Sequence, residues 1–206
     1  MQICCVLPFL VLASGSLAQT GTTGTGALVA ESASSAAALR IDSDRSHAEF
    51  WIRPLWIKRI DGRFPVIEGE VKFDPDGMTH VEVEIDARAV QMDTLAQVRF
   101  AQSEKFFDVE RHPVIRFRSR PVPRERLFEA GPVFGTVTLR GVTAPVQLEA
   151  QLMTCADPGF DCPLKASGEI SRSRFGMDSH QLAMGDQVHL DFTLWLRRDP
   201  EPEAAP

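Results

Sequence analysis

Residues 188–196 read V-H-L-D-F-T-L-W-L, and every second residue of this stretch is apolar. Val188, Leu190 and Phe192 share one face of an extended chain with the leucines that follow, because successive side chains of a strand point to opposite faces. Earlier stretches repeat the alternation; they are 47–53, 64–73, 81–85, 115–118, 133–139, 146–152 and 164–170. The pattern predicts half-buried antiparallel strands, about eight in all.

Turn-forming residues separate the alternating stretches, as in D-P-D-G at 74–77. Residues 94–107 lack the alternation, and this interval predicts a short helix or a lid. About eight antiparallel strands in roughly 160 residues favour an all-β barrel or a sandwich. Gly69, Gly135 and Gly168 fall on the inward face, and they favour a hollow barrel because they leave space there. Glycines at bulges of a filled core are the alternative.

The first eighteen residues have the features of an export signal. Residues 3–13 are apolar apart from Pro8, and Ser16 and Ala18 place small residues before a cleavage site that follows Ala18. A buried helix is the alternative, and both Pro8 and the Gly/Thr-rich tract downstream disfavour it. The sequence therefore predicts a signal peptide over 1–18 and a mature protein that is periplasmic or secreted.

The mature chain has a predicted folded centre between two polar segments. Residues 19–38 are mostly Thr, Gly, Ser and Ala with one charge, Glu31, and residues 199–206 are acidic and rich in proline. Neither segment buries enough apolar surface to offset chain entropy, so both are predicted to be disordered. The predicted barrel domain covers 39–198.

Charge and hydropathy exclude two classes of protein. The chain carries 22 basic and 28 acidic residues, a net charge of −6, and it has no basic block. These properties make a nucleic-acid partner unfavourable. No apolar run reaches the ~20 residues that span a bilayer, so no transmembrane segment is predicted in the mature chain.

The mature chain keeps two cysteines, because Cys4 and Cys5 lie in the predicted signal. Cys155 and Cys162 flank A-D-P-G-F-D. In an exported protein, two cysteines around a Pro-Gly turn predict a disulfide. The alternative is a metal pair, which requires two further ligands. The sequence offers no C-x-x-C or H-x-x-x-H partner, so no metal site is predicted.

Signatures of catalysis are missing from the sequence. The five histidines are scattered, and no G-x-S-x-G, phosphate-binding glycine loop or dinucleotide fingerprint occurs. We therefore predict no catalytic residue and no cofactor. A catalyst for an apolar substrate is an alternative, in which His112 acts with Asp108 or Arg99. The S-R-S-R stretch at 171–174 suits a phosphate-binding surface or a solvated turn.

Short motifs follow one another along the chain, each of them weak alone. They are L-R-I-D at 39–42, S-H-A-E-F at 46–50, G-R-F at 62–64, E-G-E-V-K-F-D-P at 68–75, F-F-D-V-E-R-H-P at 106–113, G-V-T-A-P-V at 141–146 and S-R-S-R-F-G-M at 171–177. Together they resemble the YceI-like family over about 41–197. The resemblance implies an exported, lipocalin-like antiparallel barrel, here an eight-stranded one with a short helical insertion.

The resemblance also implies a ligand, because members of this family are associated with a polyisoprenoid or isoprenoid-quinone-type lipid held in an elongated apolar pore. It implies no catalysis, and a homodimer is possible. Three departures from the family pattern fall at polar positions near the expected mouth, which makes Arg45, Arg99 and Arg174 candidates for the lipid head group. A filled barrel that serves as an interaction module is the alternative function. The candidate lining residues are Phe50, Ile52, Phe64, Phe73, Val83, Ile85, Phe106, Ile115, Phe117, Val137 and Leu139.

Overall fold

The computed structural model describes residues 38–54, 58–179 and 184–198. The predicted signal peptide and the acidic tail lie outside these ranges, as does the predicted linker up to residue 37. Within the described ranges, no helix has the length and hydropathy that crossing a membrane requires.

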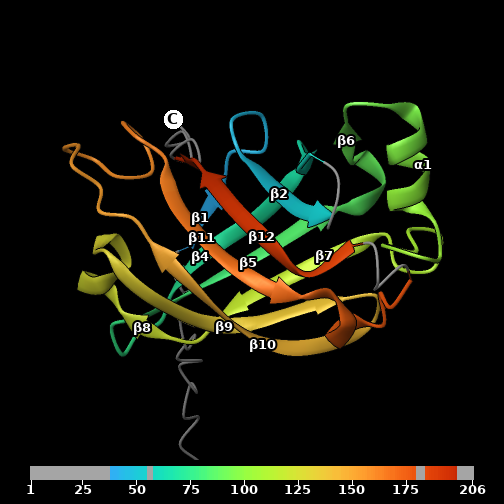
Figure 1. Ribbon diagram of the computed structural model, residues 1–206. Coiled ribbons are helices and arrows are strands. Elements are labelled where there is room, and N and C mark those ends of the chain that lie inside the picture. Colours follow the sequence, from blue (N-terminus) through green and yellow to red (C-terminus); the bar gives the residue numbers. More distant parts are fainter. Residues whose placement is uncertain (1–37, 55–57, 180–183, 199–206) are drawn as a thin grey trace, which may run out of the picture. The chain divides into compact units, whose positions relative to one another are not determined.

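The described residues form one antiparallel sheet of thirteen strand segments (Figure 1). The strands are β1 (Ala38–Ile41), β2 (His47–Pro54), β3 (Ile60–Phe64), β4 (Ile67–Phe73), β5 (Met78–Asp86), β6 (Gln91–Met92), β7 (Val114–Ser119), β8 (Val122–Pro123), β9 (Gly131–Leu139), β10 (Val142–Ala150), β11 (Leu164–Ser171), β12 (Met184–Leu194) and β13 (Leu196–Arg197). The helices are α1 (Leu95–Gln102) and the 3-10 turns η1 (Ala87–Ala89), η2 (Arg124–Phe128) and η3 (Arg172–Phe175).

The thirteen described segments group into eight longer runs. Segments β1 and β2 lie along β13 and β12, and β3 and β4 lie along β2 and β1. Segments β5 and β6 continue this pattern along β4 and β3, while β7 and β8 both pair with β5. With β9, β10, β11 and the β12–β13 run, the thirteen described segments follow eight runs, so the strand count is higher than the predicted eight because several runs are broken.

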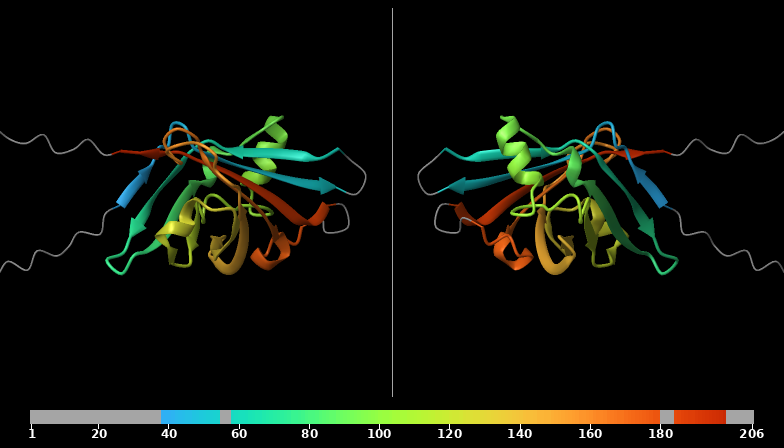
Figure 2. Two further views of the ribbon diagram at one scale, coloured as in Figure 1. Left: turned by 90° about the vertical axis from the view of Figure 1, so that its left-hand side faces the viewer. Right: turned by 90° about the vertical axis from the view of Figure 1, so that its right-hand side faces the viewer.

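The ladder of strand pairs returns to its start. Strand β12 pairs with β11, continues through Trp195 into β13, and β13 pairs with β1. From β1 the ladder runs through β4, β5, β7, β9 and β10 back to β11. The sheet therefore curls around an interior, as the side views in Figure 2 show. The all-β barrel is confirmed; the alternation favoured it alongside a sandwich, and the family resemblance implied its lipocalin-like form.

The helical insertion forms where the alternation is missing. The Thr94 hydroxyl accepts a hydrogen bond from the Gln97 backbone N–H, and the Gln97 side chain accepts one from the Thr94 backbone N–H, which is a capping box at the start of α1. Beyond α1, the chain brings Phe106 and Phe107 into the interior, where both are buried. The predicted short helix is confirmed, and it lies at one end of the barrel (Figure 1).

The end of the barrel opposite α1 carries η2 and the segment between β10 and β11 (Figure 1). Cys155 and Cys162 are joined by a disulfide in that segment, as predicted. The barrel therefore has two different ends. We call the end near α1 the capped end and the end near η2 the open end.

The glycines that favoured a hollow barrel have a different role. A Cβ at Gly135 would lie 2.8 Å from the Phe117 ring, and a Cβ at Gly168 would lie 2.6 Å from Leu148 Cδ2. Side chains of neighbouring strands already occupy the space that these glycines leave. The glycines thus allow large side chains to pack inward, which corrects the expectation that they leave the interior empty.

Candidate functional site

The open end holds an apolar cavity of about 270 Å³. Strands on all sides of the barrel contribute aliphatic side chains to it, and η2 contributes Leu127. Among the polar side chains of its lining are Ser119, Arg126, Glu129 and Lys165. Its apolar lining includes Ile41, Val71, Val81, Val83, Phe117, Val133, Leu148, Ala150, Met153, Leu164, Ala166, Phe192, Leu194 and Leu196.

The capped end holds a smaller cavity of about 50 Å³. Aromatic rings take up much of the space around it. Phe107 lies 5.5 Å from Phe50, 5.4 Å from Phe64 and 4.6 Å from Phe106, measured between ring centroids. These separations and the edge-on orientations are those of a packed aromatic cluster.

Two rings line both cavities, and no other described residue does so. Phe117 and Phe192 lie with their centroids 6.5 Å apart and their planes inclined by 32°. Both rings are buried. The interior is therefore divided into two chambers by an aromatic pair.

Most of the residues predicted to line the ligand site surround the smaller cavity. Val83 lines the larger one, whereas Ile52 and Phe73 line neither. Ile52 is 1% exposed, and the Arg124 guanidinium lies 4.4 Å above the Phe73 ring. The predicted residues at the smaller cavity are Phe50, Phe64, Ile85, Phe106, Ile115, Phe117, Val137 and Leu139.

The larger cavity is built mainly from residues outside the predicted set. Leu148, Leu194 and Leu196 have the same alternation as the predicted residues, so the sequence did carry a signal for them. Leu127 comes from η2, where no periodicity marks it.

The three arginines proposed for the head group line neither cavity. The Arg45 guanidinium lies 3.5 Å above the Trp195 ring, a cation–π contact. Arg99 is exposed on α1 and Arg174 is exposed in η3. Their role at a head group stays a prediction.

Arg172, in the S-R-S-R stretch, is 1% exposed and is held by backbone carbonyls. Its Nε donates to the carbonyl oxygen of Gly185 at 3.0 Å, and Nη2 donates to that of Met184 at 3.1 Å. Its Nη1 donates to the carbonyl oxygens of Ser179 and Met177. Because these bonds join the chain after η3 to the start of β12, Arg172 has a structural role.

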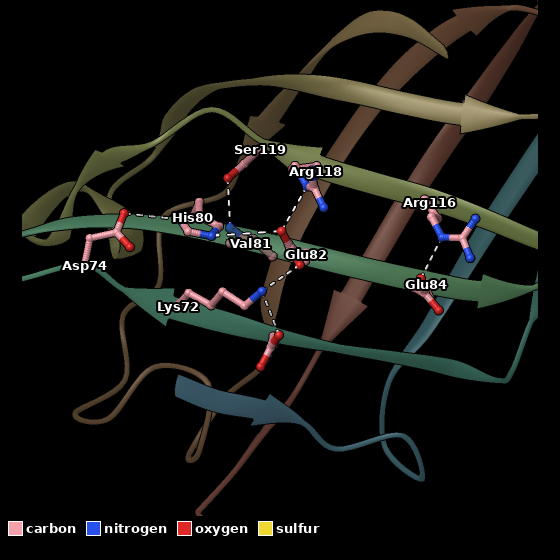
Figure 3. Close-up of polar contacts among 10 residues, drawn as sticks. Lys72, Asp74, His80, Val81, Glu82, Glu84, Arg116, Arg118 and Ser119 are labelled. Atoms are coloured by element: carbon pink, nitrogen blue, oxygen red, sulfur yellow. Dashed lines mark hydrogen bonds and ion pairs between the residues drawn. The ribbon is translucent and has the colours of Figure 1, made fainter. Parts of the chain in front are cut away.

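The outer face of β4, β5 and β7 carries a ladder of ion pairs (Figure 3). Lys72 Nζ donates to Glu82 Oε2 at 2.8 Å, which lowers the pKa of Glu82 and raises the pKa of Lys72. Arg118 Nε lies 2.9 Å from Glu82 Oε1, and Arg116 Nε donates to Glu84 Oε1 at 2.7 Å.

This ladder borders a polar depression of about 720 Å³, the largest of the described cavities. Lining charges such as Glu82 and Glu84 are matched by arginine partners in the surface itself. A ligand there would compete with existing ion pairs, so the interior is the better candidate site.

The residues of the catalytic alternative do not converge on the interior. His112, Asp108 and Arg99 line neither cavity. The Asp108 carbonyl oxygen accepts hydrogen bonds from the backbone N–H groups of Arg111 and His112 in the turn before β7. Among the described residues, no group of three metal-ligating side chains is close enough to hold a metal ion.

A family model and curated relatives both match most of this chain. A family model described as the YceI-like domain matches residues 39–196. A UPF0312 protein of Photorhabdus laumondii is 32% identical over 162 residues, which are 75% of this chain and 83% of that protein. A UPF0312 protein of Serratia proteamaculans is 30% identical over 164 residues, which are 76% of this chain and 84% of that protein.

Solved structures share the fold. A polyisoprenoid binding domain from Saccharophagus degradans has a TM-score of 0.59 at 16% identity, with 80% of this chain and 99% of that chain covered. BcnA of Burkholderia cenocepacia has a TM-score of 0.56 at 18% identity, with 75% of this chain and 98% of that chain covered. At these identities the likeness concerns the fold alone.

Proposed function

Because the chain belongs to the YceI-like domain family, we propose that it binds the apolar tail of a polyisoprenoid or isoprenoid-quinone lipid inside its barrel. In this proposal the protein is exported through its N-terminal signal and acts as a carrier or a store, without catalysis. The fold shared with the Saccharophagus polyisoprenoid binding domain supports this choice of ligand.

The larger cavity is the observation that carries the proposal. Its lining is predominantly aliphatic, and its few polar side chains include Arg126, Glu129 and Lys165. Transfer of an isoprenoid tail from water into such a lining is favourable because apolar area is removed from solvent. The polar side chains would then face the head group, with Arg126 and Lys165 suited to an anionic or carbonyl oxygen.

The amount of tail that fits sets the strength of binding. At roughly 30 Å³ for each water-sized group, 270 Å³ holds about nine carbon-sized groups. At about 0.8 kcal/mol per buried CH₂ group, these contribute about 7 kcal/mol, which is less than the ~8 kcal/mol of a micromolar complex. Tight binding therefore requires that the interior admit more of the chain.

Native mass spectrometry with lipid extraction tests the proposal on the chain purified from its own host. An isoprenoid lipid bound at one copy per protein supports it. The delipidated protein should also take up a fluorescent polyprenyl probe at micromolar concentration. Absence of both a bound lipid and probe uptake contradicts the proposal.

A matched pair of variants on β10 locates the bound probe. Ala150 lines the larger cavity, and Gln147 is exposed on the outer face of the same strand. Ala150→Trp should reduce uptake at least about tenfold by filling the cavity, and Gln147→Trp should leave uptake unchanged. Equal uptake by both variants places the probe elsewhere.

One observation favours the second candidate function, an envelope interaction module with a filled barrel. The capped end retains only about 50 Å³ beside its aromatic cluster. This candidate predicts no lipid in the extract and no uptake of the probe.

A further inference from the structure

We propose that Phe192 is the movable half of an internal gate, and that its position decides how many isoprene units of a tail the barrel admits. The inference rests on the proposed function, because it names the residue that selects among tails by length.

The inward side chains of β7 pass in order from one cavity to the other. Ile115 lines the smaller cavity, Ser119 lines the larger cavity, and Phe117 between them lines both. Because alternate residues of a strand share a face, β7 crosses the boundary at Phe117.

Strand β12 crosses the same boundary. Leu190 lines the smaller cavity, Leu194 lines the larger cavity, and Phe192 between them lines both. The ring centroids of Phe192 and Phe117 are 6.5 Å apart, within the range of interacting aromatic pairs. The two rings together form the wall between the chambers.

Phe117 is fixed by its surroundings. Its cross-strand neighbours are Val83 on β5 and Val137 on β9. Its ring occupies the space above Gly135, where a Cβ would lie only 2.8 Å from ring atom Cε2. Two β-branched neighbours and a close backbone leave this ring little room to turn.

Phe192 has much smaller neighbours. Its cross-strand partners are Ala48 on β2 and Ala166 on β11. Ala48 lines the smaller cavity and Ala166 lines the larger one, so the ring has a methyl group and open volume on both sides. These two alanines leave the Phe192 ring more room to change its χ1 rotamer than the two valines leave the Phe117 ring. The difference between the two rings identifies Phe192 as the one that moves.

Movement of Phe192 would join the chambers and add about 50 Å³, which is room for about two further carbon-sized groups. A tail of about two isoprene units fits the larger cavity alone, and a longer tail must either stay in water at the mouth or pass between the two rings. The gate therefore affects long tails and leaves short ones unaffected. The ligand class it favours is an unbroken apolar chain of more than about two isoprene units.

Binding of three alcohols to the delipidated full-length protein tests the gate. Geraniol, farnesol and geranylgeraniol carry two, three and four isoprene units on the same hydroxyl head. We expect Phe192→Ala to strengthen binding of geranylgeraniol by about tenfold and that of geraniol by less than about threefold, as measured by calorimetry. Phe192→Leu should give a smaller gain in the same order, and it replaces the alanine variant if that variant does not fold.

Leu194→Ala is the matched control, because Leu194 lines only the larger cavity on the same strand. It should change the affinities for all three alcohols by similar factors. An equal change for all three alcohols in both Phe192 variants overturns the gate while the proposed function stands. If no alcohol binds to the wild-type protein or to any variant, the gate and the proposed function both fail.

Discussion

The two ends of the barrel differ although the same strands build both. The capped end is packed with aromatic rings around about 50 Å³, whereas the open end surrounds about 270 Å³ with aliphatic side chains. The segment after α1 inserts Phe106 and Phe107 into the capped end. At the open end, η2 contributes Arg126 and Leu127 to the cavity lining, and the segment between β10 and β11 contributes Met153. Segments outside the strands therefore determine which end is filled.

The largest expected effect is a difference in the free energy of unfolding that is lost when a lining side chain is truncated at each end. Phe50 is 2% exposed and contacts two rings, so Phe50→Ala should lower the free energy of unfolding by about 3–5 kcal/mol. Leu127 at the open end is only partly buried, and Leu127→Ala should cost about 1 kcal/mol. Urea unfolding measures both. Equal losses would mean that the open end is packed as tightly as the capped end.

The next effect concerns the disulfide at the open end. Replacing Cys155 and Cys162 together by serine should cost about 2–3 kcal/mol, because the bond restricts the unfolded chain. Reductant should lower the thermal midpoint of the wild-type protein and leave that of the double variant unchanged. A double variant as stable as the wild type would show that this end contributes nothing through its crosslink.

A smaller effect is expected at the boundary between the ends. Gly135→Ala would place a Cβ 2.5 Å from the Arg118 carbonyl oxygen and 2.8 Å from the Phe117 ring, so it should cost about 1–3 kcal/mol. Thr136→Ala, on the outer face beside it, should stay within about 0.5 kcal/mol. Thermal unfolding compares the two variants, and equal effects would contradict close packing at the boundary.

The smallest expected effect concerns the ion pair between Lys72 and Glu82, which lies on the outer face of the barrel and at neither end. The Lys72 hydrogen bond lowers the pKa of Glu82 in the folded protein. Its stabilisation is therefore present above the unfolded pKa of about 4.3 and is lost as the pH falls through the folded pKa. Glu82→Gln should cost roughly 1 kcal/mol or less at neutral pH and almost nothing at low pH.

Urea midpoints at both pH values test this assignment. Glu84→Gln is the control on the same strand, and its more exposed pair with Arg116 should give a smaller difference. A loss for Glu82→Gln that persists at low pH would point to packing rather than to charge.

The strands could be predicted because their signal is local. Alternation places Val188 and Leu190 on the inner face whatever the rest of the chain does. The breaks at 42–46 and at Trp195 could not be predicted, since they depend on which strands pair across the barrel. The same limit applies to Gly135, whose role depends on a ring from the neighbouring strand.

The candidate site was predicted unevenly for the same reason. Residues such as Phe50 and Val137 were identified as inward-facing, but alternation does not reveal whether an inward residue lines space or fills it. The larger cavity exists because η2 and the disulfide segment leave it unfilled, and neither segment has a periodicity to interpret.

The pairing of β1 with β13 makes the first and the last strands of the domain into a seam. These two strands are separated by nearly the whole domain, so they can pair only after the chain between them has folded. Such non-local pairing makes folding slow. A truncation before Leu196 would remove β13, so β1 would keep only its pairing with β4 and would expose an unpaired edge, a template for aggregation. The last few residues of the domain therefore determine whether the chain folds into a closed barrel or into an open sheet that is prone to aggregate.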